Sequence, residues 1–253
     1  MDRPCTATGY DASCASAPTA NPPRTLTPLH ITVLTRKLVP ALNGCVRCAC
    51  VVAAFAAGLA HSADLAPAAP PSAVNRLAEA VLSTRDAGGR AFAIVDKAGA
   101  TLWLFDGQGH PIAHSPVLVG QARGDVAPPD IGTRALARVK PFEKITSAGR
   151  YLTEPGRNTR GEDIVWLDYD AALSMHRVRD VAGESRLQRL QTPSVTDNRI
   201  SFGCINVPAS FYDRHVDPLF SRSAGVVYVL PETLPLARVF PFADHATPAA
   251  SAR

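Results

Sequence analysis

Hydrophobic and polar positions follow two different periods along this chain, and the change of period separates a helix from strands. Between residues 73 and 85, the apolar side chains recur at the spacing of an amphipathic helix. Gly88 and Gly89 break that pattern, and the apolar residues beyond them gather in short runs bounded by turn-forming residues. We therefore predict one short helix followed by a mainly β domain.

The short apolar runs have the length and the β-branched and aromatic content of strands. A long loop is expected over residues 121–133, which contain Gly124, Pro128, Pro129 and Gly132. A second helix is expected over Pro208–Phe220, with Pro208 in its first turn. The expected strands are residues 91–97, 101–105, 111–120, 162–168, 171–177 and 225–230.

The segment before the helix has the pattern of a secretory leader. Arg36, Lys37 and Arg47 precede 13 apolar, uncharged residues, Cys48–Ala60, and small residues follow. This arrangement is typical of a signal peptide, and the run is too short for a comfortable membrane span. We predict a signal peptide over about residues 36–63. The mature protein is then expected to be periplasmic and to have no integral membrane span.

Shifts in composition divide the chain into four parts. The first combines a Pro/Thr/Ala-rich stretch, expected to be disordered, with the signal peptide, and an Ala/Pro linker follows it. The tail after the domain is again rich in proline and alanine. The predicted boundaries are 1–63 for the leader, 64–73 for the linker, 74–232 for the catalytic domain and 233–253 for the tail.

The net charge gives no support for a nucleic-acid partner. The 253 residues carry a formal charge of +4, but residues 1–63 contribute five basic and two acidic groups. The rest of the chain carries 21 basic and 20 acidic groups and is close to neutral. Nucleic-acid binding requires a basic face with stacking aromatic residues, so we expect no such partner.

The cysteines are distributed unevenly. Five of the six lie in the first 50 residues, so an exported mature chain retains only Cys204. A lone thiol in an oxidising compartment is either buried or used. One alternative is that Cys204 is a small buried hydrophobic residue. Cys45, Cys48 and Cys50 have metal-like spacing but no second ligand pair, so we predict neither a metal nor a cofactor.

A cysteine nucleophile needs a base to accept its proton, and histidine is the usual base near neutral pH. His176 is the best candidate because it ends the apolar run of residues 171–175, a rigid element. The alternative is a strand histidine with a purely structural role.

The residues around this pair resemble a known family. Ser201-Phe202-Gly203-Cys204-Ile205-Asn206, with His176 upstream, is similar to the signature of the L,D-transpeptidase catalytic domain, the YkuD-like fold. That signature is a histidine, a spacer, then Ser/Thr-His-Gly-Cys, an aliphatic residue and Arg or Asn. The opening hairpin over 94–105 and the segment Thr146–Tyr151 also resemble the family, and the resemblance covers Phe92–Leu230. It implies a β-sandwich or barrel with a short N-terminal helix and a helix after the nucleophile.

Three positions depart from the family pattern. Phe202 replaces the histidine that usually stands two residues before the cysteine. His176 and Cys204 are 28 positions apart, which is longer than usual and implies an inserted lid or loop at Arg179–Arg199. Ser147 stands where proline is usual.

The resemblance also implies roles for individual residues. Cys204 would attack the amide between the third and fourth residues of a peptidoglycan stem, releasing D-alanine, and His176 would accept the thiol proton. The backbone amides of Gly203, Cys204 and Ile205 would bind the oxyanion. Ser201 and Asn206 would orient His176 or hold polar groups of the substrate.

Two further expectations come from the residues alone. The helix that begins at Pro208 would favour the thiolate through its dipole. Arg199, Arg157 and Arg160 are weaker candidates for binding substrate carboxylates, and the alternative for them is solvated loop charges.

The expected function is therefore an exported L,D-transpeptidase of cell wall biogenesis, with peptidoglycan stem peptides as its substrates. Two alternatives remain open. If water is the acceptor, the same chemistry gives a thiol carboxypeptidase or amidase. A catalytically decayed cell-wall-binding module is the third possibility, and Phe202 is the feature that favours it.

Overall fold

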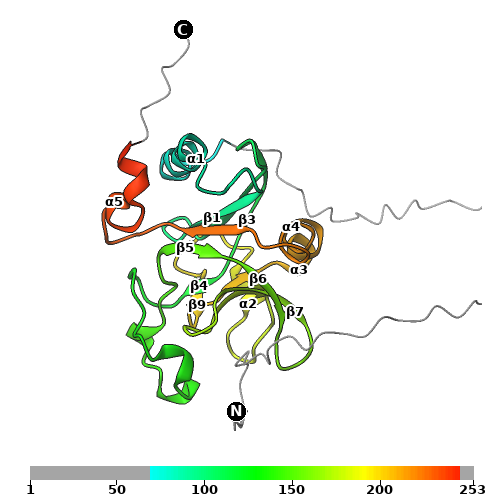
Figure 1. Ribbon diagram of the computed structural model, residues 1–253. Helices are drawn as coiled ribbons and strands as arrows, with labels where there is room; N and C mark the ends of the chain where they lie inside the picture. Colours follow the sequence, from blue (N-terminus) through cyan, green and yellow to red (C-terminus); the bar gives the residue numbers. More distant parts are fainter. Residues whose placement is uncertain (1–68, 246–253) are drawn as a thin grey trace, which may run out of the picture. The chain divides into compact units, whose positions relative to one another are not determined.

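The computed structural model describes residues 69–245 (Figure 1). The predicted signal peptide, residues 64–68 of the predicted linker and residues 246–253 lie outside the described residues. The described part is rich in β structure and contains several sheets, as the sequence predicts.

The larger sheet has five strands in the order β3-β2-β1-β11-β5. Its centre is the parallel pair β1 (Phe92–Asp96) and β11 (Val226–Val229), and every other neighbouring pair is antiparallel. Apart from the terminal Asp96, the central strands are apolar because both faces of this sheet are covered. The outer strands are β2 (Thr101–Phe105), β3 (Pro111–Pro116) and β5 (Gly149–Leu152).

The second sheet has four strands in the order β10-β8-β7-β6. Its β8 and β10 are parallel, whereas β6, β7 and β8 are antiparallel neighbours. A third, two-stranded sheet pairs β4 with β9, and none of the three sheets closes into a barrel within residues 69–245. The strands are β4 (Val119–Gly120), β6 (Glu154–Arg157), β7 (Asp163–Asp168), β8 (Leu173–Arg177), β9 (Arg199–Ser201) and β10 (Ile205–Val207).

One apolar cluster lies between the two larger sheets. Alternate side chains of each strand point to one face, so Val95 and Val229 of the first sheet meet Val165, Met175 and Ile205 of the second. The other face of the second sheet therefore carries the residues that alternate with Met175 and Ile205. That face is where the polar site forms.

Helices cover the outer face of the five-stranded sheet (Figure 1). Helix α1 (Ser72–Thr84) packs there with α5 (Leu236–Val239) and η5 (Pro241–His245). Phe240 is fully buried, and burying such a side chain contributes roughly 1.5–3 kcal/mol. The domain thus extends beyond the boundary that we expected at residue 232, because apolar residues of the predicted tail complete the covering of this sheet.

The predicted helix over Pro208–Phe220 is present but divided. It consists of α3 (Ala209–Phe211), a π-helical turn η4 (Tyr212–Val216) and α4 (Asp217–Phe220). The remaining helical elements are short: η1 (Ile131–Thr133), η2 (Leu136–Arg138), η3 (Pro141–Glu143) and α2 (Arg186–Arg189). None of the helices within residues 69–245 is long and apolar enough to cross a membrane.

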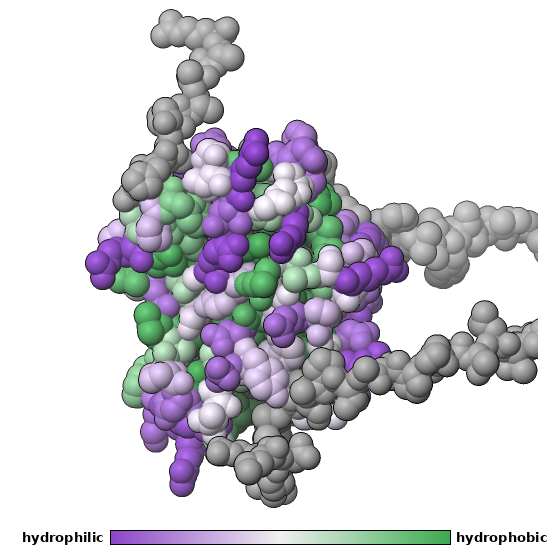
Figure 2. Space-filling model, viewed as in Figure 1, coloured by the Kyte–Doolittle hydropathy of each residue, from purple (hydrophilic) through white to green (hydrophobic). Residues whose placement is uncertain are grey.

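The exposed large hydrophobic side chains come from separate elements. Examples are Ile112 on β3, Phe142 in η3 and Leu187 in α2. On the face viewed in Figure 2, hydrophilic and hydrophobic residues are interspersed. That face therefore carries no single extended apolar patch.

A buried cluster of charges ties the C-terminal segment to the sheets. Lys97 donates to Asp125 Oδ1 at 2.7 Å, and Arg199 pairs with Glu232. Asp125 also accepts from the amides of Glu232, Thr233 and Leu234, at distances of 2.7–2.8 Å. Burial raises the pKa of Asp125, but these hydrogen bonds and the Lys97 ammonium lower it more, so the net pKa lies well below its usual range.

We predict that Asp125→Asn lowers the free energy of unfolding at pH 7 by about 3 kcal/mol, because it takes from the buried Lys97 ammonium its nearest carboxylate and leaves only Glu232, 4.0 Å away. Because the folded pKa of Asp125 is depressed, its contribution to stability is present above the unfolded pKa, about 3.9. That contribution is lost as the pH falls toward the folded pKa.

The test is denaturant unfolding of the wild type and the variant from pH 7 to pH 3. The two unfolding free energies should differ by a constant amount down to about pH 5 and converge below about pH 4. A difference that stays constant or widens at pH 3 would contradict this account of the cluster.

Candidate active site

Cys204 lies at a sharp bend between β9 and β10. The hydroxyl of Ser201 donates to the carbonyl of Cys204 at 2.7 Å and accepts from the amide of Gly203 at 3.1 Å. Ser201 therefore closes the bend locally and fixes the backbone on both sides of Phe202.

Gly203 is required by the shape of this bend. Its φ is +138°, and a Cβ there would lie 2.9 Å from the carbonyl oxygen of Ile145. Thr146 links this bend to the neighbouring strand β4. Its hydroxyl donates to Gly203 O at 2.6 Å and accepts from Gly120 N at 2.8 Å. The bend thus depends on close backbone contact that only glycine allows.

We predict that Gly203→Ala destabilises the fold by about 1–3 kcal/mol through backbone strain and slows alkylation of Cys204 by iodoacetamide. Gly161→Ala is the matched control, because Gly161 also has a positive φ, +78°, but meets nothing within 4 Å. Thermal unfolding and the alkylation rate are measured on both variants. An alkylation rate that falls equally in both, or in neither, would show that the bend does not set the reactivity of the thiol.

The parallel register of β8 and β10 brings the two candidate catalytic residues to one face. Asn206 is paired with His176, and Cys204 lies two positions earlier beside Ser174, with Sγ 3.5 Å from Oγ. Side chains two positions apart on a strand share a face, so His176, Ser174, Cys204 and Asn206 line the face opposite the core. The side chain of Ile205 points the other way and is fully buried in the core.

The hydrogen bonds of His176 define its tautomer. Its Nδ1 lies 2.8 Å from the carbonyl oxygen of Arg177, which can only accept, so Nδ1 carries a proton. Its Nε2 lies 3.4 Å from the Asn206 side-chain nitrogen, which donates to it. In the neutral ring, Nε2 is therefore the nitrogen that can accept a proton.

The Cys204 thiol is half-buried and held by polar groups. Sγ donates to the carbonyl oxygen of Ala172 at 3.3 Å. Burial raises the pKa of the thiol, but hydrogen bonding and charge interaction with His176, together with hydrogen bonds from Ser174, lower it more. The net pKa lies below its ordinary value, which favours the reactive thiolate.

The helix after β10 does not account for this shift. It begins at Ala209, four residues separate it from Cys204, and the three extended residues of β10 among them alone span about 10 Å. The dipole effect of a helix fades within about one turn of its end. Our expectation that this helix favours the thiolate is therefore replaced by the contacts of His176 and Ser174.

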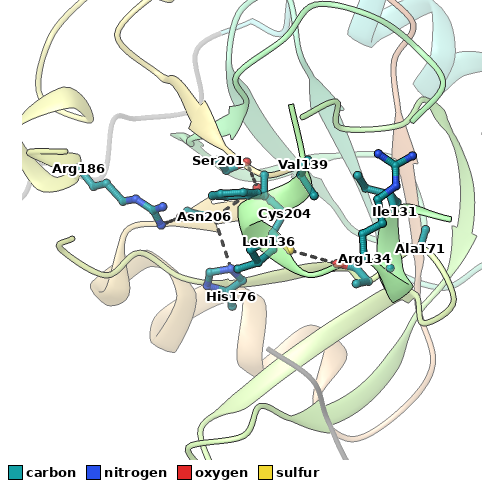
Figure 3. Close-up of a pocket in the computed structure, with 13 residues that line it drawn as sticks. Ile131, Arg134, Leu136, Val139, Ala171, His176, Arg186, Ser201, Cys204 and Asn206 are labelled. Atoms are coloured by element: carbon teal, nitrogen blue, oxygen red, sulfur yellow. Dashed lines mark hydrogen bonds between the residues drawn. The ribbon is translucent and has the colours of Figure 1, made fainter. Parts of the chain in front are cut away.

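Cys204, His176, Asn206 and Ser201 line one pocket, whose empty space, including its open mouth, is about 780 Å³ (Figure 3). The remaining lining comes from the 131–139 segment, from the β7–β8 turn and from two residues near the bend: Ile131, Gly132, Arg134, Leu136, Val139, Ala171, Ala172, Arg186 and Phe202.

The three arginines that we considered for substrate carboxylates do not line this pocket. The guanidinium of Arg199 belongs to the buried charge cluster, where it pairs with Glu232 and donates to Lys97 O at 2.9 Å. Arg157 is exposed and pairs with Asp163, and Arg160 is exposed on the turn between β6 and β7. None of the three is placed for the role that we expected.

Two other arginines do reach the pocket, and the sequence pattern did not single them out. Arg134 is neutralised by Asp130 and Glu143, at 2.5 Å and 2.7 Å. Arg186 comes from the predicted insertion after β8 and is only 6% exposed. Ser174 was also missed, although its place two residues before His176 on a predicted strand puts it on the same face.

Phe202, which stands where the family has histidine, takes a different partner. The ammonium of Lys144 lies 3.8 Å from the centre of its ring. Burial lowers the pKa of Lys144; Glu184 raises it and Arg186 lowers it, and the net pKa lies below its ordinary value. Phe202 thus places a cation–π contact at the pocket.

No protein-family model matches this sequence, and no curated protein matches it either. Within residues 69–245, no group of three or more His, Cys, Asp or Glu residues is arranged to hold a metal ion. The chemistry of the site therefore has to be argued from its own side chains.

Proposed function

We propose that this protein is an L,D-transpeptidase that acts on peptidoglycan stem peptides through an acyl-thioenzyme at Cys204. The observation that carries the proposal is the arrangement of Cys204, immediately before β10, and His176, on the neighbouring parallel strand β8. There the pKa of the thiol is lowered and the Nδ1 proton of His176 is fixed by Arg177 O. Nucleophilic thiol catalysis requires such a pair.

In the first half of the reaction, the thiol proton passes to Nε2 of His176 and Sγ attacks the carbonyl carbon of the amide between the third and fourth stem residues. A C–S bond forms, the C–N bond breaks, and D-alanine leaves with the proton from His176. In the second half, an amine of another stem gives a proton to His176 and attacks the thioester. The new amide forms as the C–S bond breaks, and the proton on His176 returns to Sγ.

The developing oxyanion needs a hydrogen-bond donor close to Sγ. The amide of Gly203 already donates to Ser201 Oγ. Asn206 exchanges backbone hydrogen bonds with Leu118. Because the backbone amides of successive strand residues point to opposite sides of the strand, the amide of Ile205 points toward β8. Of the three amides that we considered, the proposal therefore assigns the oxyanion to that of Cys204.

The proposed place of action is the periplasm, because the leader pattern over residues 36–63 is that of a signal peptide. The finer fold assignment, to the L,D-transpeptidase type of β-sandwich, is part of the same proposal. It is supported by the two facing sheets, the short helix α1 and the helical segment after the nucleophile.

The test is to incubate the purified protein with tetrapeptide muropeptides and to analyse the products by mass spectrometry. Cys204→Ala is the control. We expect cysteine-dependent cross-linked dimers that have lost one D-alanine. Cysteine-dependent tripeptides without dimers would show a carboxypeptidase instead, and unchanged muropeptides would contradict activity on this substrate.

A further inference from the structure

The predicted insertion between β8 and β9 contributes a buried cation to the site. Arg186 begins α2 in this segment, and its side chain is 8% exposed (Figure 3). A buried guanidinium is costly unless its donors are used. Nε donates to Glu184 at 2.5 Å, and Nη1 donates to Oδ1 of Asn206 at 3.0 Å.

The contact with Arg186 fixes which way the amide of Asn206 points. A guanidinium can only donate, so the Asn206 atom that faces Arg186 is the oxygen. The amide nitrogen is then directed to the other side, where it lies 3.2 Å from Cys204 O and 3.4 Å from His176 Nε2. Asn206 thus presents a donor, rather than an acceptor, to the nitrogen that must receive the thiol proton.

This orientation matters for the chemistry of His176. If the amide of Asn206 rotated, its oxygen would face Nε2 and would stabilise a proton there. It would thereby favour the neutral tautomer that carries its proton on Nε2, at the expense of the Nδ1–H bond to Arg177 O. In that tautomer Nε2 has no lone pair and could not accept the proton of Cys204.

The segment that carries Arg186 is held firmly. Arg189 donates to the carbonyl oxygens of Glu184 at 2.7 Å and Asp197 at 3.1 Å. Leu190 is buried against Leu118, the residue whose backbone pairs with Asn206. The insertion therefore places the guanidinium at a fixed position beside β10.

We propose that Arg186 is a positioning residue that acts through Asn206 to keep Nε2 of His176 ready to accept the Cys204 proton. The residue comes from the insertion and not from the nucleophile motif. The inference rests on the thiol site of the proposed function, but it does not depend on which peptide the enzyme uses.

The test therefore uses a substrate-independent reaction, alkylation of Cys204 by iodoacetamide. The thiolate displaces iodide from carbon, a C–S bond forms, and the thiol proton passes to His176. The rate is followed on the full-length chain by mass analysis of the Cys204 peptide between pH 5 and pH 9. The five cysteines in residues 1–50 serve as internal references.

Arg186→Gln should slow alkylation of Cys204 at pH 7 about tenfold and move its pH profile upward, without changing the reference cysteines. Arg186→Lys, which keeps a cationic donor, should recover part of the rate. Glu184→Gln is the matched control, because it removes the charge partner of Arg186 but leaves the bond to Asn206, and its rate should stay within about twofold of wild type. Thermal unfolding verifies that each variant is folded.

The route through Asn206 is tested by combining substitutions. If Arg186 acts through Asn206, the double variant Arg186→Gln/Asn206→Ala should react no more slowly than Asn206→Ala alone. A wild-type rate and pH profile in Arg186→Gln, or effects that multiply in the double variant, would overturn the proposal. Because no stem peptide is used, inactivity toward muropeptides would leave this result unaffected.

Discussion

Cys204→Ala is expected to abolish stem-peptide acylation, lowering the rate by at least about 10⁴-fold. In the proposed reaction, Sγ forms the covalent bond, and the remaining groups of the pocket only position or activate it. The substitution removes the hydrogen bonds of the thiol, to Ala172 O at 3.3 Å and with Ser174 Oγ at 3.5 Å, together with its interaction with His176, and no buried charge is left without a partner. The fold should therefore survive the change.

Two measurements check this prediction. Single-turnover acylation with a tetrapeptide donor gives the rate, and thermal unfolding gives the stability. Cys204→Ser is the second variant, because it keeps a polar group beside Ser174 but replaces the ionisable thiol with a hydroxyl that His176 must deprotonate at much greater cost. Acylation of a folded Cys204→Ala protein at the wild-type rate would remove Cys204 from the mechanism.

His176→Ala is expected to lower the acylation rate by about 10²- to 10⁴-fold while donor binding is retained. The substitution removes the proton acceptor and also the interactions that lower the pKa of Cys204. Burial of the thiol remains and raises its pKa, so less thiolate is present at any pH below the new value.

The pH dependence of Cys204 alkylation provides a second check of this prediction. In the wild type, the lowered pKa keeps Cys204 reactive toward iodoacetamide below the ordinary thiol pKa of about 8.5. In His176→Ala, the alkylation profile should move to higher pH, and alkaline buffer should restore part of the rate. An unchanged profile would mean that another group activates the thiol.

Much of the fold can be predicted from local pattern. The runs that become β1, β2 and β11 are apolar at nearly every position because both faces of the central sheet are buried, and their bounds differ from expectation by only a residue or two. The strand expected over 111–120 is instead divided into β3 and β4.

Elements that depend on their neighbours could not be predicted in this way. The strand β6 contains Pro155 and Gly156 and no buried residue, and its extended form comes from pairing with β7. The packing of Phe240 was missed for a similar reason, since the proline-rich sequence around it does not indicate which sheet it covers.

The residues of the candidate site show the same difference between local pattern and distant contact. Cys204 and His176 could be selected from the motif and from a strand end, and the register of β8 and β10 places them on one face. Partners of charged residues could not be predicted, because charge alone does not identify the contact. Arg199 is bound by Glu232, which follows it by 33 positions, whereas Arg186 reaches Asn206.

The most direct test of the central claim is the intact mass of the protein during reaction with a tetrapeptide stem. We expect a transient adduct equal to the stem minus D-alanine, located on the Cys204 peptide and absent from Cys204→Ala. Turnover of the stem with no adduct on Cys204, or an equal adduct on the Cys204→Ala protein, would contradict an acyl-thioenzyme at this site.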